Sequence, residues 1–146
     1  MRTIVLFPTA GEAEGFRRRC PAAECEITGV GLAAAAAATA RMIVSRRPDL
    51  LLLAGIAGTY PASEIAVGEV VAVAEERVAG LPERYADAYR PTFCVSGLRT
   101  AVSNSVVRSG APADGAEVEN MEGAAFFAVA AALGVQAAEV LSLIHI

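Results

Sequence analysis

The stretch that most constrains the fold is the unbroken aliphatic run from Asp49 to Ala54, DLLLLA, which is followed by glycines at positions 55 and 58. A strand with one face in water alternates apolar and polar residues, whereas a continuous apolar run is typical of a strand buried on both faces. Such strands occur mainly in parallel sheets that helices cover on both sides. We therefore expect an α/β fold.

Short strands and helices are predicted to alternate along the rest of the chain. Strands are expected at 3–7, 26–30, 68–75, 101–107 and 135–144, helices at 12–20, 32–47 and 121–133, and a long surface loop at 79–97. The second of these helices is rich in alanine, the residue with the highest helix propensity. This order predicts a single domain over residues 1–146, with a mostly parallel central sheet flanked by helices.

Charge and composition exclude several classes of protein. The formal net charge is -4 and the only basic cluster is Arg17–Arg19, so nucleic acid is not an expected partner. The apolar segment 124–135 is shorter than the roughly 20 residues of a membrane span. Three cysteines without CxxC spacing and a histidine next to the last residue argue against a disulfide framework or a zinc site and favour a reducing cytoplasm. No cofactor is expected, because GVG at 29–31 lacks the third glycine of a dinucleotide fingerprint.

Four glutamates fall near the ends of expected strands, where ligands bind in open α/β sheets. A carboxylate in the first turn of a helix is stabilised by the helix dipole, which explains one of Glu12 and Glu14. The other could be a general base, because an apolar pocket raises the pKa of a carboxyl group. Glu119 is equally compatible with a helix cap, whereas the carboxylate of Glu122 could accept two hydrogen bonds from the diol of a ribose.

The glycines of AGIAGTY, residues 54–60, have two interpretations. They could form a tight turn that needs positive φ, or they could let backbone N–H groups approach an anion or a ribose closely. The segment alone does not decide between them.

Four segments in this order resemble the nucleoside phosphorylase and nucleosidase superfamily, and within it the futalosine hydrolase branch. They are PTAGEAEGF (8–16), GVG (29–31), AGIAGTY with the following IAVGEVVAVAEE (65–76), and VENMEGAAFF (118–127). The resemblance covers about residues 2 to 140. It implies an enzyme that hydrolyses the N-glycosidic bond of futalosine and releases hypoxanthine, in the futalosine route to menaquinone. It also implies a homo-oligomer that binds a small-molecule nucleoside.

The resemblance implies roles for individual residues. Glu14 matches the glutamate that activates the attacking water, Met121 the methionine beneath the ribose, and Glu122 the glutamate that binds the ribose hydroxyls. The other expected site residues are Gly55, Ile56, Ala57 and Gly58, which match a loop beside the ribose, and Glu12, Glu119 and Asn120, which are supportive.

The last residues depart from the pattern of the superfamily. The resemblance places the group that relieves the leaving purine of its charge on the strand after the last helix. That strand reads EVLSLIHI here, and His145 falls near the expected position among different neighbours. A C-terminal helix is also missing. We therefore expect residues 141–146 to be a non-native tail, the strand from Val135 to present an apolar face to solvent, and the chain by itself to be silent on futalosine. The alternatives are another purine nucleosidase or phosphorylase, a non-catalytic nucleoside-binding fragment, or an α/β nucleotide-binding module of another lineage.

Overall fold

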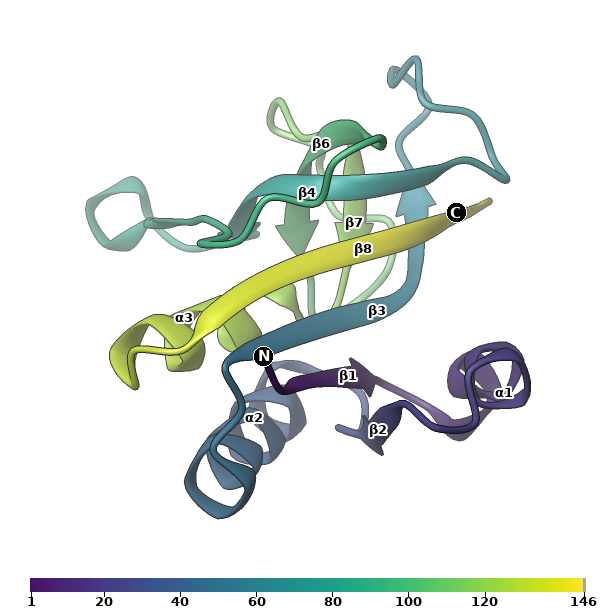
Figure 1. Cartoon of the computed structure of the whole chain (residues 1–146). Coiled ribbons are helices and arrows are strands. Elements are labelled where there is room, and N and C mark those ends of the chain that lie inside the picture. The colour runs from purple at the N-terminus through teal and green to yellow at the C-terminus, as the bar shows by residue number, and fades with distance from the viewer. Residues whose placement is uncertain (146) are drawn as a thin grey trace.

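The computed structural model describes residues 1–145, in which strands and helices follow one another largely as expected (Figure 1). The strands are β1 (Thr3–Phe7), β2 (Glu24–Ile27), β3 (Leu50–Thr59), β4 (Val70–Val78), β5 (Ala88–Tyr89), β6 (Arg99–Ser105), β7 (Val118–Asn120) and β8 (Gln136–His145). The helices are α1 (Ala10–Arg19), α2 (Leu32–Arg46) and α3 (Gly123–Ala132), and a 3-10 turn, η1, spans Glu83–Tyr85. The predicted α/β fold with a mostly parallel sheet and flanking helices is confirmed.

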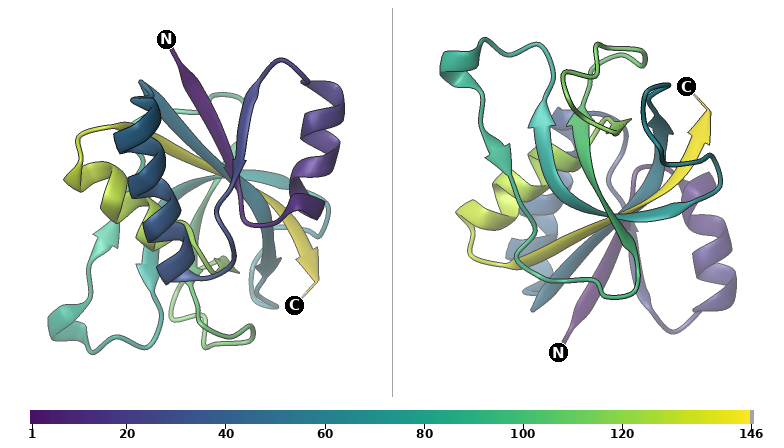
Figure 2. Two further views of the ribbon diagram at one scale, coloured as in Figure 1. Left: turned by 90° about the horizontal axis from the view of Figure 1, so that it is seen from below. Right: turned by 90° about the horizontal axis from the view of Figure 1, so that it is seen from above.

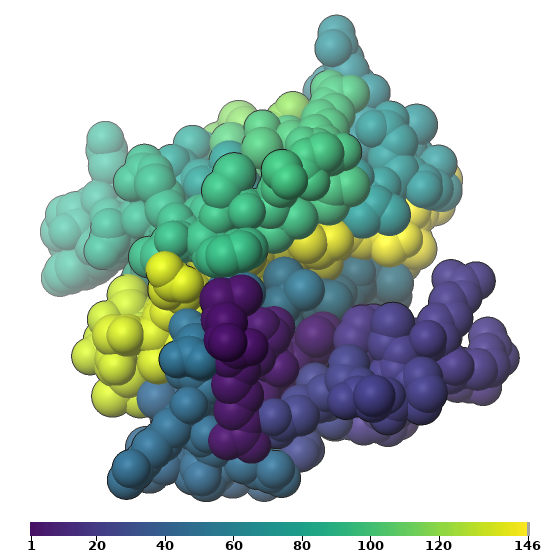
Figure 3. Space-filling view, in the orientation of Figure 1, coloured from purple at the N-terminus to yellow at the C-terminus, as the bar shows by residue number. Residues whose placement is uncertain are grey.

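The sheet is mixed, and β8 lies inside it. Along its whole length β8 pairs in parallel with β3, and its other edge pairs antiparallel with β4. β7 joins the end of β3 to β6, which is parallel to β4, so the pairings run in a closed circuit through β3, β8, β4, β6 and β7. In Figure 3 the yellow C-terminal part of the chain separates the blue N-terminal part from the teal and green part.

The core forms between this sheet and the helices. Figure 2 shows α2 and α3 side by side on one face of the strands, with α1 on the opposite side of β1 and β2. α2, in which Ala35 and Ala38 are buried, packs against α3, where Phe126 and Phe127 are 0% and 2% exposed. The aliphatic run in β3 is buried as its composition predicts, with Leu51 and Leu53 at 0% and 2%.

Several boundaries differ from the prediction. β3 continues through Gly55 and Gly58 to Thr59, so these glycines lie in a strand, and the tight-turn interpretation is wrong. The expected loop at 79–97 contains η1 and the short β5, which pairs with β4. β7 was not predicted, and because it occupies 118–120 the helix after it begins at Gly123.

The expectation of an apolar face along β8 is wrong for most of the strand. Its position between β3 and β4 buries Ala137, Leu141 and Leu143, each of which is 2% exposed, and leaves Ile144 at 43%. Within residues 1–145, no helix is both long enough and apolar enough to cross a membrane. The expected tail at 141–146 forms the end of β8 up to His145, and residue 146 lies outside the described residues.

Candidate active site

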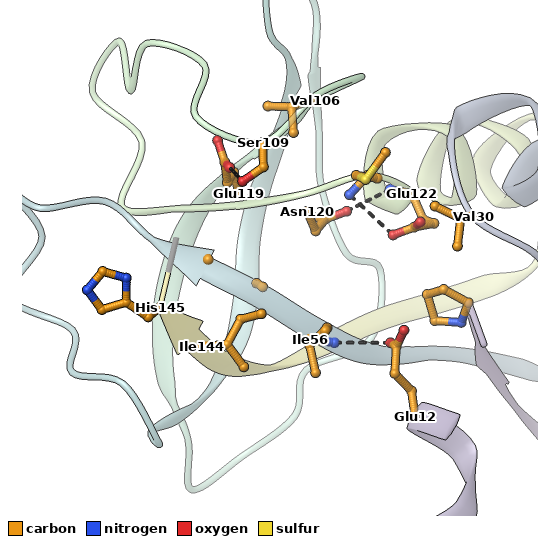
Figure 4. Close-up of a pocket in the computed structure, with 14 residues that line it drawn as sticks. Glu12, Val30, Ile56, Val106, Ser109, Glu119, Asn120, Glu122, Ile144 and His145 are labelled. Carbon is orange, nitrogen blue, oxygen red and sulfur yellow. Dashed lines mark hydrogen bonds between the residues drawn. The ribbon is translucent and has the colours of Figure 1, made fainter. Parts of the chain in front are cut away.

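A cavity of about 280 Å³ lies where β1 and β3 end and β7 turns into α3 (Figure 4). Loops and helix N-termini meet here, as at the ligand sites of other α/β sheets. The cavity is lined by Pro8, Glu12, Val30, Ile56, Ala57, Gly58, Val106, Ser109, Glu119, Asn120, Met121, Glu122, Ile144 and His145.

Glu12 is fixed between the start of α1 and the end of β3. Thr9 is the N-cap of α1, and its Oγ1 accepts a hydrogen bond from the N–H of Glu12 at 3.2 Å. The same hydroxyl donates to Oε1 of Glu12 at 3.0 Å, and the N–H of Ile56 donates to Oε2 at 3.2 Å. The carboxylate is therefore held in one orientation at the wall of the cavity.

Gly55 lets this carboxylate approach β3. A Cβ at position 55 would lie 2.9 Å from Oε2 of Glu12 and 3.3 Å from Cδ of Pro8. The glycine is needed for close approach of the strand to Glu12.

Glu14 lies elsewhere. It is exposed on α1 and does not line the cavity. Residues two apart on an α-helix are separated by about 200° around the axis, so Glu12 and Glu14 cannot face the same side. The structure brings Glu12 to the cavity, and it does not bring Glu14 there.

Glu122 faces Glu12 across the cavity and is held by backbone donors (Figure 4). The N–H of Gly31 donates to Oε1 at 3.0 Å, and the N–H of Met121 donates to Oε2 at 3.2 Å. Burial raises the pKa of Glu122, the two N–H donors act against this, and the nearby carboxylate of Glu12 raises the pKa further. Burial is the main cause of the raised pKa, and the smaller contribution of Glu12 shows that the two carboxylates interact.

Asn120 caps the helix that carries this part of the site. Its Oδ1 accepts hydrogen bonds from the N–H groups of Glu122 and Gly123, both at 2.8 Å. Glu122 itself is the N-cap residue of α3, but its side chain makes no capping bond. The carboxylate of Glu122 is thus turned to the cavity while Asn120 satisfies the helix N-terminus.

Glu119 anchors the loop after β6 and is not a helix cap. It lies in β7, and its Oε1 accepts hydrogen bonds from Oγ of Ser109 and the N–H of Gly110, both at 2.8 Å. Tyr60 lies near it, and burial raises the pKa of that phenol to about 12. Glu119 therefore holds the loop that forms the other end of the cavity.

Comparison with known proteins supplies relatives of this fold. No family model and no curated protein matches the sequence. Among solved structures, a futalosine hydrolase mutant of Helicobacter pylori strain 26695 matches with a TM-score of 0.85 and 13% identity, over 99% of this chain and 86% of that one. The 5'-methylthioadenosine/S-adenosylhomocysteine nucleosidase of Neisseria meningitidis, in complex with methylthio-immucillin-A, matches with a TM-score of 0.83 and 16% identity, over 99% and 86%.

A third relative is the nucleosidase of the same name from Colwellia psychrerythraea 34H, in complex with adenine. It matches with a TM-score of 0.79 and 17% identity, over 99% of this chain and 83% of the other. The chain shares the α/β fold of these solved structures.

Several residues that line the cavity, or that hold its carboxylates in place, were not predicted from the sequence. Thr9 could have been found, because Thr-x-x-Glu over residues 9–12 is the signature of a helix start that turns the glutamate back toward its cap. Val106 and Ser109 belong to a segment with no pattern that points to a ligand. Gly31 acts through its backbone, with φ of 96°, and only the glycine itself hinted at this.

The residues predicted to bind the substrate, together with the supporting Asn120, fall into two groups. Ile56, Ala57, Gly58, Asn120, Met121 and Glu122 all line the cavity. Gly55 does not line it, and instead gives Glu12 the space to reach β3. The structure thus brings together two carboxylates, a thioether and an apolar wall in one cavity.

Proposed function

We propose that the protein is a nucleosidase that hydrolyses the N-glycosidic bond of a purine ribonucleoside. The observation that carries the proposal is that Glu12 and Glu122 face one cavity, each held by backbone N–H groups. Neither carboxylate has a basic side chain bonded to it among residues 1–145 that would explain it as a structural ion pair. Two fixed acceptors in one cavity suit a ligand with several donors.

The ribose is the part of the substrate that Glu122 recognises. Its 2'- and 3'-hydroxyls donate to the carboxylate of Glu122, and the sugar lies against Met121 and the wall formed by Ile56 to Gly58. A carboxylate accepts two such hydrogen bonds at once. Because the substrate supplies both donors, a sugar that lacks one hydroxyl leaves a buried oxygen without a partner.

Glu12 is the general base, in place of Glu14. Its carboxylate takes a proton from a water molecule, the water oxygen bonds to C1' of the ribose, and the bond from C1' to the purine nitrogen breaks. The bonding electron pair leaves with the purine, which takes up a proton from water, and Glu12 then returns its own proton to the solvent. Positive charge builds up on the ribose during this step, so carboxylates on two sides stabilise the transition state more than the substrate.

Two purine substrates are considered. Futalosine, with release of hypoxanthine, is the first, on the resemblance of the sequence motifs. An adenine nucleoside such as 5'-methylthioadenosine is the second, because nucleosidases that carry its name match the fold equally well. We further propose a homo-oligomer in a reducing cytoplasm, consistent with three cysteines that are all free.

The test separates the sugar end of the site from the base end. p-Nitrophenyl β-D-ribofuranoside has a leaving group that departs without protonation, so its hydrolysis needs only the residues at the sugar end. We expect the chain to hydrolyse this riboside. If it also releases a purine base, we expect it to hydrolyse futalosine in preference to 5'-methylthioadenosine. Binding of inosine without hydrolysis of the aryl riboside would mean a nucleoside-binding protein without catalysis, and no binding of either would contradict the proposal.

A further inference from the structure

Two buried glutamates meet behind the cavity. Glu76 of β4 and Glu139 of β8 are 0% and 1% exposed, and neither lines the cavity that holds Glu12 and Glu122. Both carboxyl groups lie against the first residue of α3. A Cβ on Gly123 would lie 2.5 Å from Oε1 of Glu76 and 2.5 Å from Oε2 of Glu139. The N-terminus of α3, where Glu122 is the N-cap residue, therefore contacts both carboxyl groups.

The two carboxyl groups differ in their partners. Oε2 of Glu76 accepts a hydrogen bond from Oγ of Ser105 at 2.7 Å, and Oε1 accepts one from Nδ2 of Asn120. Both oxygens of Glu139 are buried, and no donor in the described part of the chain bonds to them, so the carboxyl group of Glu76 is the neighbour that a proton on Glu139 can bond. Two neighbouring carboxylates that are removed from water do not both ionise, so the charge belongs on Glu76, beside its donors and the helix N-terminus, and the proton on Glu139.

Glu76 decides which way the amide of Asn120 points. Nδ2 of Asn120 donates to Glu76 and to Oγ of Ser103, the latter at 2.8 Å, so Oδ1 is turned to the N–H groups of Glu122 and Gly123. A reversed amide would place its NH₂ against those two N–H groups. The acceptor on Glu76 therefore holds Asn120 in the orientation that caps α3.

The hydroxyl of Ser105 extends the same arrangement. It donates to Glu76 and accepts a hydrogen bond from the N–H of Ala124 at 2.8 Å. The N–H groups of residues 122, 123 and 124, which a helix leaves without internal partners, are thus all bonded to side chains that Glu76 orients.

We propose that Glu76 is a positioning residue for Glu122, and that protonated Glu139 keeps the buried pair at a single negative charge. The inference rests on the proposed function, because it takes Glu122 to bind the ribose diol. Glu76 does not touch the substrate, and it acts through Asn120 and Ser105 on the start of α3. Glu139 fills the space beside Glu76 as a neutral acid, so it adds no second negative charge to the buried pair.

Binding of a matched pair of nucleosides tests this inference. The Kd values of inosine and 2'-deoxyinosine are compared for the wild type and for variants of the pair. A lost hydrogen bond to a buried carboxylate corresponds to a preference of roughly 5- to 150-fold for inosine in the wild type. In Glu76→Leu, which fills the space but removes both acceptors, we expect the preference to fall to about 3-fold or less.

Three further variants make the result specific. Glu76→Gln keeps an acceptor for Asn120 and should restore most of the preference, and Glu139→Gln, which copies the neutral acid, should leave it unchanged. Glu75→Gln is the matched control, because Glu75 is next to Glu76 but pairs with Arg77 and Arg90 at the surface. An unchanged preference in Glu76→Leu, or an equal loss in Glu75→Gln, would overturn the inference.

Amide hydrogen exchange gives a readout that does not depend on any ligand. In the free protein, Glu76→Leu should speed exchange at residues 122 to 124, while Glu139→Gln and Glu75→Gln should not. If the wild type does not discriminate between the two nucleosides, the proposed function fails, and the exchange data still decide whether Glu76 orients the start of α3. If Glu76→Leu does not fold, Asn120→Asp carries the test, because it exchanges the NH₂ that donates to Glu76 and Ser103 for an oxygen and sets another carboxyl group against Glu76. Exchange at residues 122 to 124 should then be faster, and unchanged exchange would overturn the inference.

Discussion

The N–H of Gly31 donates a hydrogen bond to Oε1 of Glu122 at 3.0 Å, and this bond joins positions that are 91 residues apart. Gly31 is the N-cap of α2 and Glu122 is the N-cap of α3, so the bond ties together the first turns of two helices that pack side by side. The position of the carboxylate is therefore set by the core of the fold. A site built on rigid elements in this way keeps its geometry without a ligand.

Glu122→Gln should abolish the preference for a ribose over a deoxyribose. The neutral amide offers one acceptor where the carboxylate offers two, so the charge-assisted bonds to the diol are lost. The ratio of Kd values for inosine and 2'-deoxyinosine, measured by calorimetry, should fall from roughly 5- to 150-fold to near unity. Glu14→Gln is the control, because Glu14 is exposed and outside the cavity.

Binding of the ribonucleoside should weaken on the acid side at a higher pH than an ordinary glutamate would cause. The diol needs the ionised form of Glu122, and burial together with Glu12 raises the pKa of this group above 4.5. The buried Glu139, whose pKa the charge of Glu122 also raises, lies outside the cavity and does not contact the ribose. Inosine affinity measured from pH 4 to pH 8 should rise with pH, and a flat profile would contradict the role of the carboxylate.

Gly55→Ala should reduce catalysis more than stability. The new Cβ would meet Oε2 of Glu12 at 2.9 Å and Cδ of Pro8 at 3.3 Å, which pushes the carboxylate away from the N–H of Ile56. We expect hydrolysis of the aryl riboside to fall by roughly 10- to 100-fold, since a misplacement of about 1 Å costs this much. Gly15→Ala in α1 is the matched control, because a Cβ there meets nothing within 4 Å.

Glu139→Gln should stabilise the protein at neutral pH. Burial and the charge of Glu76 raise the pKa of Glu139 well above 4.5, so the folded protein keeps a proton that the unfolded chain has released. The stability that this proton contributes is present below pH 4.5 and is lost as the pH rises toward the raised pKa, by about 1.4 kcal/mol per pH unit. Urea unfolding at pH 4.5 and pH 7 should show a gain for the variant only at the higher pH, and an equal gain at both would contradict this.

The sequence predicted where the helices and strands lie along the chain better than it predicted which strands pair with each other. Apolar periodicity marked β3 and the alanine-rich α2, because burial and helix propensity are local properties of a segment. The pairing of β8 with both β3 and β4 could not be read in this way, since it depends on contacts between residues far apart in the chain. The short β7 was missed because three residues are too few for a period to show.

For the candidate site, too, the sequence identified single residues better than it identified which residues lie together. The resemblance singled out Glu122 and Met121, which line the cavity, but it selected Glu14 where helix geometry places Glu12. The adjacent pair Glu75 and Glu76 carried a signal that was not used: neighbours on a strand point to opposite faces, so one of the two had to point inward. The interior accepts the carboxylate of Glu76 because the neighbouring Glu139 of β8 is neutral. Glu139 is far from Glu76 in the sequence, so only the three-dimensional structure shows that the two are neighbours.

Hydrolysis of p-nitrophenyl β-D-ribofuranoside by the wild type, Glu12→Gln and Glu14→Gln tests the central claim most directly. The claim is that Glu12 activates the water and that Glu14, exposed on the other side of α1, does not. We predict that the wild type releases nitrophenolate, that Glu12→Gln lowers kcat by roughly 10² to 10⁴ with little change in KM, and that Glu14→Gln retains the wild-type rate. A loss confined to Glu14→Gln, or equal rates for all three proteins, would contradict the account.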